Sequence, residues 1–393
     1  MQNKDEPTPH GLSMTQISHA IGLARIVLIV GLVFLHYGTF PNSTTAPFEG
    51  LDVHEHRFIT WFNSAVVYFF FSSVPLLSMV SGWLFFSFMK EKGDAWAAIF
   101  RRIRRRFTSL YMPLVVWNLG YLAIFYAAYR YNPNASIFIH YSRLGMDFTV
   151  AGWKDYVNAI FGVTGDPFAF QFWFVRDLFV TTLISPLFWF LLQRAPWTGA
   201  VILGTIWLTV LGEWNLVIFE RPDVPLFFYL GALVHQKHLS LEVPMRTTIG
   251  AFVVFVMLAC LRALAPYVAD FTDHVYPDWI LVVTRLLRLF GVVGCWGIIY
   301  RVAQTKRGIA LSSYGGLAFF LHSAHWPLLA VVRAAVSHFV PVDTDALMMV
   351  HYFLSVIITV SIGLILGLFL AKKIPSVFAL MNGGRLLGQP KSS

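Results

Sequence analysis

The sequence has few charged residues and almost no cysteine for its length. Only 12% of its 393 residues are Asp, Glu, Lys or Arg, and only two are cysteines. Cys260 and Cys295 lie in apolar runs without metal-ligand spacing, so we expect neither a disulfide framework nor a metal site. This low charge, with a mean hydropathy of +0.65, excludes an ordinary soluble globular protein.

The N-terminal segment lacks the features of a signal peptide, and no linker or second soluble domain is recognisable. Residues 1–16 are polar, without a short apolar core or a small-residue cleavage site. The sequence therefore predicts a cytoplasmic N-terminal tail at 1–16, a single transmembrane domain at 17–373 and a cytoplasmic C-terminal tail at 374–393.

Apolar segments dominate the chain instead, and most are long enough to cross a bilayer as helices. The ten segments are 17–38, 63–89, 107–128, 170–193, 197–212, 224–236, 247–266, 279–301, 309–334 and 347–371. The fifth and sixth are the weakest, and we expect the short sixth to be tilted or broken. The predicted fold class is all-α: a polytopic integral membrane protein with about ten transmembrane helices.

The basic residues predict how these helices are oriented. With a cytoplasmic N-terminus, the inner segments hold eighteen of the 29 Lys and Arg residues, and the outer loops hold five. Because positive charge favours the cytoplasmic side, both termini are expected to face the cytoplasm. The net charge of +9 then reflects basic loops beside membrane lipid and does not imply a nucleic-acid partner. The longest outer loop is 129–169, with an interfacial helix expected around Trp153–Phe161.

Two ionisable residues lie inside the first apolar segment. Arg25 and His36 are eleven positions apart, which places them on one helix face about 16 Å from each other. A charge within a span costs roughly 2.5–3.5 kcal/mol on insertion scales, so such residues mark functional sites by default. The alternative is an interfacial histidine with a snorkelling arginine, but Arg25 lies too deep to reach the surface easily.

Further ionisable residues lie in other predicted spans, and we expect them to converge on a water-accessible cavity. They are Arg176, Asp177, Arg285, Arg288, His322 and His325. Structural alternatives stay open. Arg176 and Asp177 can form a buried ion pair that locks helices together, and the histidines can serve as interhelical hydrogen-bond partners.

A run of arginines follows the second segment at the cytoplasmic boundary. It consists of Arg101, Arg102, Arg104, Arg105 and Arg106. Such a run can anchor to anionic lipid headgroups. It can equally bind phosphates, because guanidinium groups pair with phosphate through two hydrogen bonds, and a nucleotide cosubstrate with several phosphates would fit.

Five motifs follow one another along the chain. They are Arg25-x10-His36, Ser81–Gly82 in PLLSMVSGWLFF, the arginine run before LYMPL, FWFVRDL with Trp173, and SSYGGLAFFLHSAHWP. None is specific alone, but their order and spacing resemble the membrane acyltransferase 3 family, bacterial integral-membrane O-acyltransferases of surface carbohydrates. Many members carry an added extracytoplasmic esterase-like domain. This sequence resembles a stand-alone member.

The resemblance implies an O-acyltransferase in the cytoplasmic (inner) membrane of a bacterium. It implies acyl-CoA as cosubstrate, acetyl-CoA or succinyl-CoA, and a carbohydrate or glycolipid acceptor outside: an exopolysaccharide, O-antigen or glucan. Polysaccharide-biosynthesis proteins are the expected partners. His36 would act as general base or as acyl acceptor. The other expected catalytic residues are Arg25, Arg176, Asp177 and His322. The expected CoA-binding residues are Arg101, Arg102, Arg104 and Arg105.

The competing hypothesis is a secondary transporter in which the same charges line a substrate pathway. It predicts an internal repeat with interrupted helices at corresponding positions. No copy of LARIVLIVGLVFLH occurs in the second half of the chain, and Gly315–Gly316 is the only obvious helix interruption. Acyl transfer is therefore the favoured function.

Overall fold

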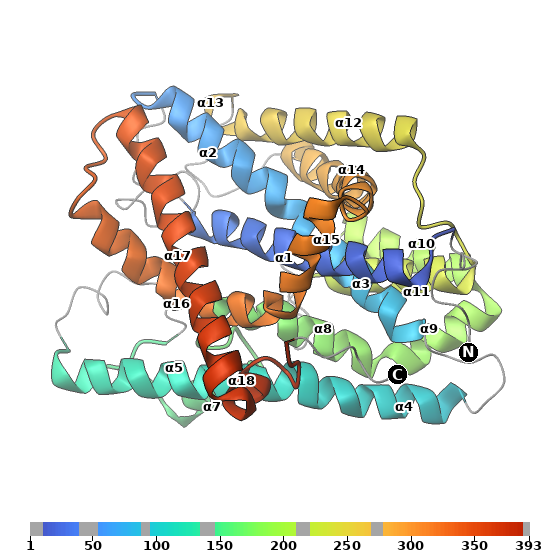
Figure 1. Cartoon of the computed structure of the whole chain (residues 1–393), viewed down its shortest axis with the longest axis horizontal. Coiled ribbons are helices and arrows are strands. Elements are labelled where there is room, and N and C mark those ends of the chain that lie inside the picture. Colours follow the sequence, from blue (N-terminus) through green and yellow to red (C-terminus); the bar gives the residue numbers. More distant parts are fainter. Residues whose placement is uncertain are drawn as a thin grey trace. The chain divides into compact units, whose positions relative to one another are not determined.

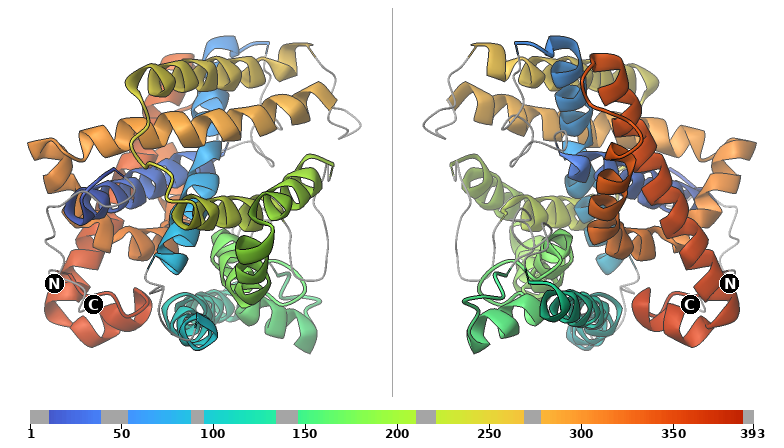
Figure 2. Two further views of the ribbon diagram at one scale, coloured as in Figure 1. Left: turned by 90° about the vertical axis from the view of Figure 1, so that its right-hand side faces the viewer. Right: turned by 90° about the vertical axis from the view of Figure 1, so that its left-hand side faces the viewer.

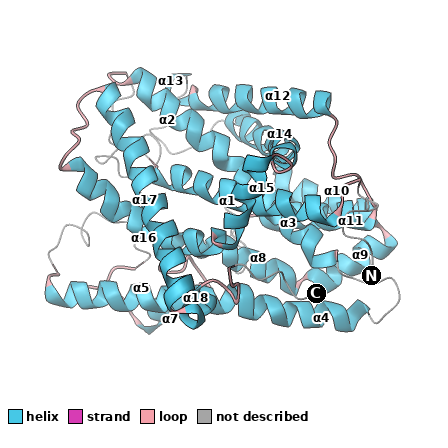
Figure 3. Ribbon diagram, viewed as in Figure 1, coloured by secondary structure: helices cyan, strands magenta, loops and turns pink. Residues whose placement is uncertain are grey.

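A computed structural model describes residues 11–38, 54–87, 95–133, 146–209, 221–268 and 278–387. Apart from turns and loops, these ranges are helical (Figure 3). Seven helical segments within them are long and apolar enough to cross a membrane, and a bent pair from Phe170 to Arg194 makes eight. The prediction of an all-α polytopic membrane protein is confirmed.

The fifth and sixth predicted spans correspond to helices that are short for a bilayer. They are α10 (Pro196–Thr209) and α11 (Asp223–Gln236), each of 14 residues. The count of ten spans and the cytoplasmic placement of both termini stay predictions. The single domain with two tails also stays a prediction.

The helices divide into two compact units, and each is described by itself. The first comprises Met1–Val80 with Val234–Leu366, and the second Ser81–Leu233 with Gly367–Ser393. Helices α3 (Ser73–Phe86), α11 and α17 (Asp345–Lys373) contribute residues to both.

The first unit holds both the N-terminal helices and most of the C-terminal half. Its elements are α1 (Met14–Tyr37), α2 (Arg57–Phe69), η1 (Phe70–Ser72), α12 (Met245–Ala263), α13 (Ala265–Val268), α14 (Asp278–Val302), α15 (Lys306–Ser312), η4 (Ser313–Gly316) and α16 (Ala318–Ser337). Helices α12 and α14 lie side by side (Figures 1 and 2). A Cβ on Gly294 of α14 would stand 2.8 Å from the backbone of Phe252, so glycine permits this close approach.

Helix α1 forms the interior of the first unit. It starts at a capping box, in which Ser13 Oγ accepts from the Gln16 amide at 3.2 Å and Gln16 Oε1 accepts from the Ser13 amide at 2.8 Å. It ends at Gly38, whose φ of 68° suits a residue without a Cβ. Because α14, α15, α16 and η4 all pack against it, α1 is apolar around most of its circumference.

The second unit is built along one continuous helix of 37 residues (Figure 1). The elements of this unit are α4 (Ala95–Arg106), η2 (Phe107–Tyr111), α5 (Met112–Tyr131), α7 (Trp153–Phe161), η3 (Phe170–Phe172), α8 (Trp173–Leu183), α9 (Ser185–Arg194), α10 and α18 (Pro375–Met381). The helix expected around Trp153–Phe161 is present as α7, and Ala159 packs with Leu122 and Phe125 of α5.

The expectation that Gly315–Gly316 is the only obvious helix interruption is wrong. The chain does break there, at η4, but α16 is also interrupted at Trp326, whose φ of −118° and ψ of 128° are extended. Pro327 causes this second break, because proline removes an N–H and disfavours helical geometry at the preceding residue. A third break bends α8 against α9 by 55°, and Pro186 lies in the first turn of α9.

Candidate active site

His36 and His325 are in direct contact in the interior of the first unit. Nδ1 of His36 lies 2.7 Å from Nε2 of His325, and the rings stack with an interplanar angle of 4° and centroids 5.0 Å apart. His36 comes from the last turn of α1, and His325 from α16, directly before the break at Trp326. Both rings are buried, so this hydrogen bond replaces one that water would form with each ring at a surface.

The contacts of His325 assign the protons of this pair. Nδ1 of His325 lies 3.3 Å from the carbonyl oxygen of Leu321, which can only accept a hydrogen bond. A neutral His325 protonated at Nδ1 therefore accepts at Nε2, and His36 donates to it from Nδ1. In this tautomer the lone pair of His36 is on Nε2. The pair is thus arranged so that His36 can act as a base through Nε2.

His322 lies beside this pair. Its ring centroid is 5.6 Å from that of His325, with an angle of 49° between the planes, and it too is buried. We call His36, His322 and His325 the histidine cluster. The sequence predicted His322 as the site residue, whereas the structure brings His325 into contact with His36. One feature of the sequence did set His325 apart: it directly precedes Trp326–Pro327, and a proline inside a helix interrupts the helix.

A second chain of buried and partly buried polar groups begins at the residue after His36. Ser337 donates to the carbonyl of Arg333 at 2.9 Å and lies 3.0 Å from Nε2 of His351, which therefore donates to it. Nδ1 of His351 then accepts from the Tyr37 hydroxyl at 2.7 Å. Arg333 donates to the Tyr37 carbonyl at 2.6 Å. These bonds hold the end of α1, and hence His36, in a fixed position.

Arg25 lies on α1, eleven residues before His36. Its side chain is half-buried, and it makes no hydrogen bond or ion pair within the described ranges. The structure therefore does not bring Arg25 into contact with His36. Its catalytic role stays a prediction.

Two other arginines in the first unit rest on aromatic rings. The guanidinium of Arg262 lies 4.6 Å from the Tyr68 ring centroid and donates to Thr284 at 3.2 Å. Arg288 lies 5.5 Å from the ring of Phe71. Cation–π contacts of this kind stabilise buried positive charge, so these arginines are compatible with an interior location.

Arg176 and Asp177 form a buried ion pair in the second unit. The Arg176 guanidinium is 2.8–2.9 Å from Oδ1 of Asp177, and it also donates to the carbonyl of Gly165 at 2.8 Å. Arg176 and Asp177 are adjacent residues of α8. Because Arg176 also bonds Gly165, it connects the start of this helix to the preceding loop. The ion pair is thus the structural alternative that the sequence left open. A catalytic role for Arg176 and Asp177 stays a prediction.

The arginine run forms the last two turns of α4 in the second unit. Arg101, Arg104 and Arg105 are exposed, whereas Arg102 is partly buried, with its guanidinium 6.0 Å from the centroid of the Phe85 ring. Three neighbouring exposed guanidinium groups can bind a polyphosphate, as they can bind lipid headgroups. The geometry of the run is therefore compatible with phosphate binding and with lipid anchoring.

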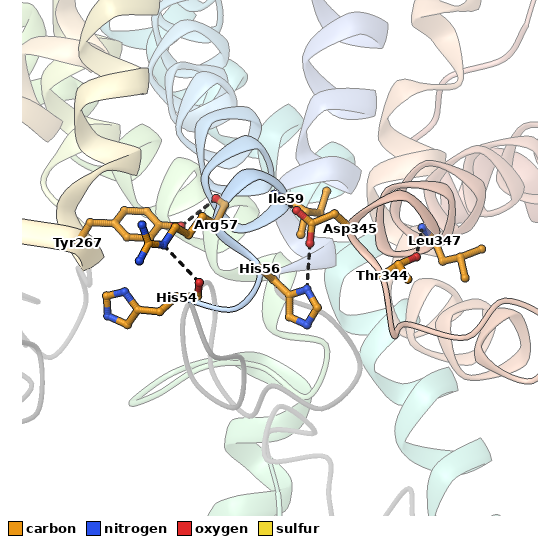
Figure 4. Close-up of polar contacts among 8 residues, drawn as sticks. All are labelled: His54, His56, Arg57, Ile59, Tyr267, Thr344, Asp345 and Leu347. Atoms are coloured by element: carbon orange, nitrogen blue, oxygen red, sulfur yellow. Dashed lines mark hydrogen bonds and ion pairs between the residues drawn. The ribbon is translucent and has the colours of Figure 1, made fainter.

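Figure 4 shows polar contacts at the start of α2 and α17 in the first unit. His56 Nδ1 lies 2.9 Å from Asp345 Oδ1, and the Ile59 amide donates to Asp345 Oδ2 at 3.4 Å. Tyr267 donates to the carbonyl of Arg57 at 2.9 Å, and partial burial raises the pKa of this hydroxyl. Asp345 thereby satisfies an amide in the first turn of α2 and joins the two helices.

The fold and these buried histidines define a polytopic membrane protein with a titratable interior site. The family model described as "Acyltransferase domain" matches residues 18–368, so the chain belongs to this acyltransferase family and is a membrane acyltransferase. The family resemblance seen in the sequence is thereby confirmed. The "Succinoglycan biosynthesis protein ExoH" of Rhizobium meliloti (strain 1021) is 24% identical over 375 residues, which cover 94% of this chain and 93% of that protein. No solved structure matches the chain significantly.

Proposed function

We propose that the protein transfers an acyl group from cytoplasmic acyl-CoA to a hydroxyl group of an extracytoplasmic carbohydrate, with His36 at the reacting centre. The 2.7 Å hydrogen bond between His36 and His325 carries the proposal. It orients the imidazole of His36 and puts its lone pair on Nε2, which is what proton abstraction requires.

Two reaction sequences use this nitrogen. As a general base, Nε2 takes the proton of the acceptor hydroxyl while the hydroxyl oxygen attacks the thioester carbonyl. The carbon–sulfur bond then breaks, and the CoA thiolate takes the proton back from His36. As a nucleophile, Nε2 bonds to the acyl carbon while the carbon–sulfur bond breaks and CoA leaves as its thiolate. The sugar hydroxyl oxygen then displaces the imidazole, and the hydroxyl proton passes to the CoA thiolate. In either sequence a protein cation would stabilise the negative oxygen of the tetrahedral intermediate.

The donor and acceptor classes rest on different observations. Acyl-CoA as donor, with an acetyl or succinyl group, rests on the family resemblance and on the exposed arginines of α4, which suit the phosphates of CoA. A polysaccharide acceptor rests on the relative whose name places it in succinoglycan biosynthesis. A cell location in the inner membrane of a bacterium follows from these two assignments.

Isotope transfer tests the proposal. Purified full-length protein in lipid vesicles is given acetyl- or succinyl-CoA labelled in the acyl group, together with a polysaccharide fraction. Label should appear in an ester of the glycan, and His36→Ala should abolish it, whereas His54→Ala, a histidine on the exposed loop before α2, should not. A His36→Ala protein that transfers label at the wild-type rate would remove His36 from the reaction.

A further inference from the structure

A stripe of fully buried polar side chains follows the bent helix pair α8–α9. Asp177 and Thr181 are four residues apart on one side of α8, and Ser185 is the first residue of α9; none of the three has exposed surface. The hydrocarbon core of a bilayer offers no hydrogen bonds. Each of these groups therefore needs a partner inside the protein or in a bound molecule.

Two members of this stripe lack such a partner in the part of the chain that the structure describes. They are the hydroxyl groups of Thr181 and Ser185. Buried hydroxyls on helices ordinarily bond a carbonyl one turn earlier, as Thr182 does to Phe179 at 2.7 Å and Ser78 to Val74 at 2.8 Å. Other buried hydroxyl groups of the described residues, those of Ser64, Ser73 and Ser81 among them, also lack a partner. What sets Thr181 and Ser185 apart is the helix break that lies between them.

The helix break at Ile184 lies between the two hydroxyl groups and is an independent sign of a ligand. There α8 and α9 meet at 55°, and Pro186 removes a backbone N–H. Irregular backbone at membrane depth is tolerated where it is buried in protein or lines a cavity, and broken helices form the substrate sites of many transporters.

The class of ligand follows from the chemistry of hydroxyl groups and from the neighbouring helix. A serine or threonine hydroxyl both donates and accepts, so it matches a secondary amide, which offers an N–H and a C=O. Helix α4, with the exposed arginines Arg101, Arg104 and Arg105, packs against both α8 and α9 (Figure 1). A molecule with phosphates at one end and a narrow chain of amides fits both features.

We propose that Thr181 and Ser185 hydrogen-bond the amide groups of the pantetheine arm of acyl-CoA. The inference rests on the proposed function, because it takes acyl-CoA as the donor. It adds a binding subsite within the second unit that neither the sequence motifs nor the family assignment point to. The subsite explains why two hydroxyl groups are buried without a partner.

Truncated donors test this subsite in the purified full-length protein. Acyl-CoA, acyl-pantetheine and the ethyl thioester of the same acyl group differ in their phosphates and amides. Thr181→Val and Ser185→Ala should each lower kcat/KM about three- to tenfold for acyl-CoA and acyl-pantetheine, the worth of one hydrogen bond, and leave the ethyl thioester unaffected. Thr182→Val is the matched control and should behave as wild type with all three donors.

The Kd of free CoA, measured by titration, gives a readout that does not need turnover. It should rise about three- to tenfold in Thr181→Val and Ser185→Ala but not in Thr182→Val. Equal Kd values in all three variants, or an equal loss with every thioester, would overturn the subsite and leave the proposed function intact. A wild-type protein that neither binds CoA nor uses any thioester would overturn the proposed function itself.

Discussion

The hydrogen bond between His36 and His325 gives the sharpest prediction for catalysis. In the assigned tautomer, His325 accepts from Nδ1 of His36 at 2.7 Å, and thereby keeps the basic lone pair on Nε2. His325→Leu would remove the acceptor, and the buried Nδ1–H of His36 would lose this bond. His36 could then adopt the other tautomer, with its lone pair on the wrong nitrogen.

The size of the effect follows from the burial of the pair. Losing a partner for a buried polar group costs about 1–3 kcal/mol, which corresponds to about a 5- to 150-fold loss of rate when the group is needed in the transition state. The loss should appear in kcat with KM nearly unchanged, because His325 acts on His36 and not on the substrate. His325→Gln should recover part of the rate, since its amide oxygen can accept from Nδ1 of His36.

The assay is acyl transfer from labelled acyl-CoA by purified protein in vesicles, over a range of donor concentrations. Ser323→Ala is the matched control, because Ser323 is buried on the same helix and its hydroxyl donates to the Phe319 carbonyl at 2.9 Å. The reasoning would be refuted by a His325→Leu protein with wild-type kcat, or by a loss confined to KM.

Three further predictions concern the donor patch, the orientation and the packing. Replacing Arg101, Arg102, Arg104 and Arg105 by Gln should raise KM for acyl-CoA with little change in kcat, because a phosphate clamp binds ground state and transition state alike; unchanged CoA binding with reduced protein abundance would instead indicate lipid anchoring. A cysteine introduced near Asp147 should react with an impermeant reagent from outside and one near Arg385 only from inside; labelling of both from one side would contradict the topology. Gly82→Ala should destabilise the protein by about 1–3 kcal/mol or prevent folding, because a Cβ would overlap the Phe228 carbonyl, and a thermal-unfolding midpoint equal to that of wild type would disprove this close contact.

The apolar pattern predicted where most of the long helices lie, because a span needs little more than length and low polarity, but it did not predict the breaks at Ile184 and Trp326. The first predicted segment, 17–38, is observed as Met14–Tyr37, and the polar start of α1 is set by the Ser13 capping box. The short helices α10 and α11 were the weakest predictions for the same physical reason: an apolar run of 14 residues does not establish whether a helix crosses a bilayer.

The partners within the site could not be predicted from spacing. Helical periodicity relates Arg25 to His36 on one helix, but it carries no information about which residue of a distant helix meets His36. That partner, His325, is 289 positions away, and its place depends on how α16 packs against α1. The buried hydroxyl groups of Thr181 and Ser185 were equally hidden, because ordinary helices bury many hydroxyl groups that bond their own backbone.

If the histidines serve only as interhelical hydrogen-bond partners, the expected effect of their loss on stability can be estimated. Such bonds in membrane proteins contribute on average about 0.6 kcal/mol and at most about 1.7 kcal/mol. If the pair is only structural, His36→Ala should lower stability by up to this amount and reduce activity in proportion to the folded fraction. If His36 carries the chemistry, activity should fall by about 10²-fold or more in protein that remains folded. Thermal unfolding and acyl transfer measured on one His36→Ala preparation therefore separate the two explanations.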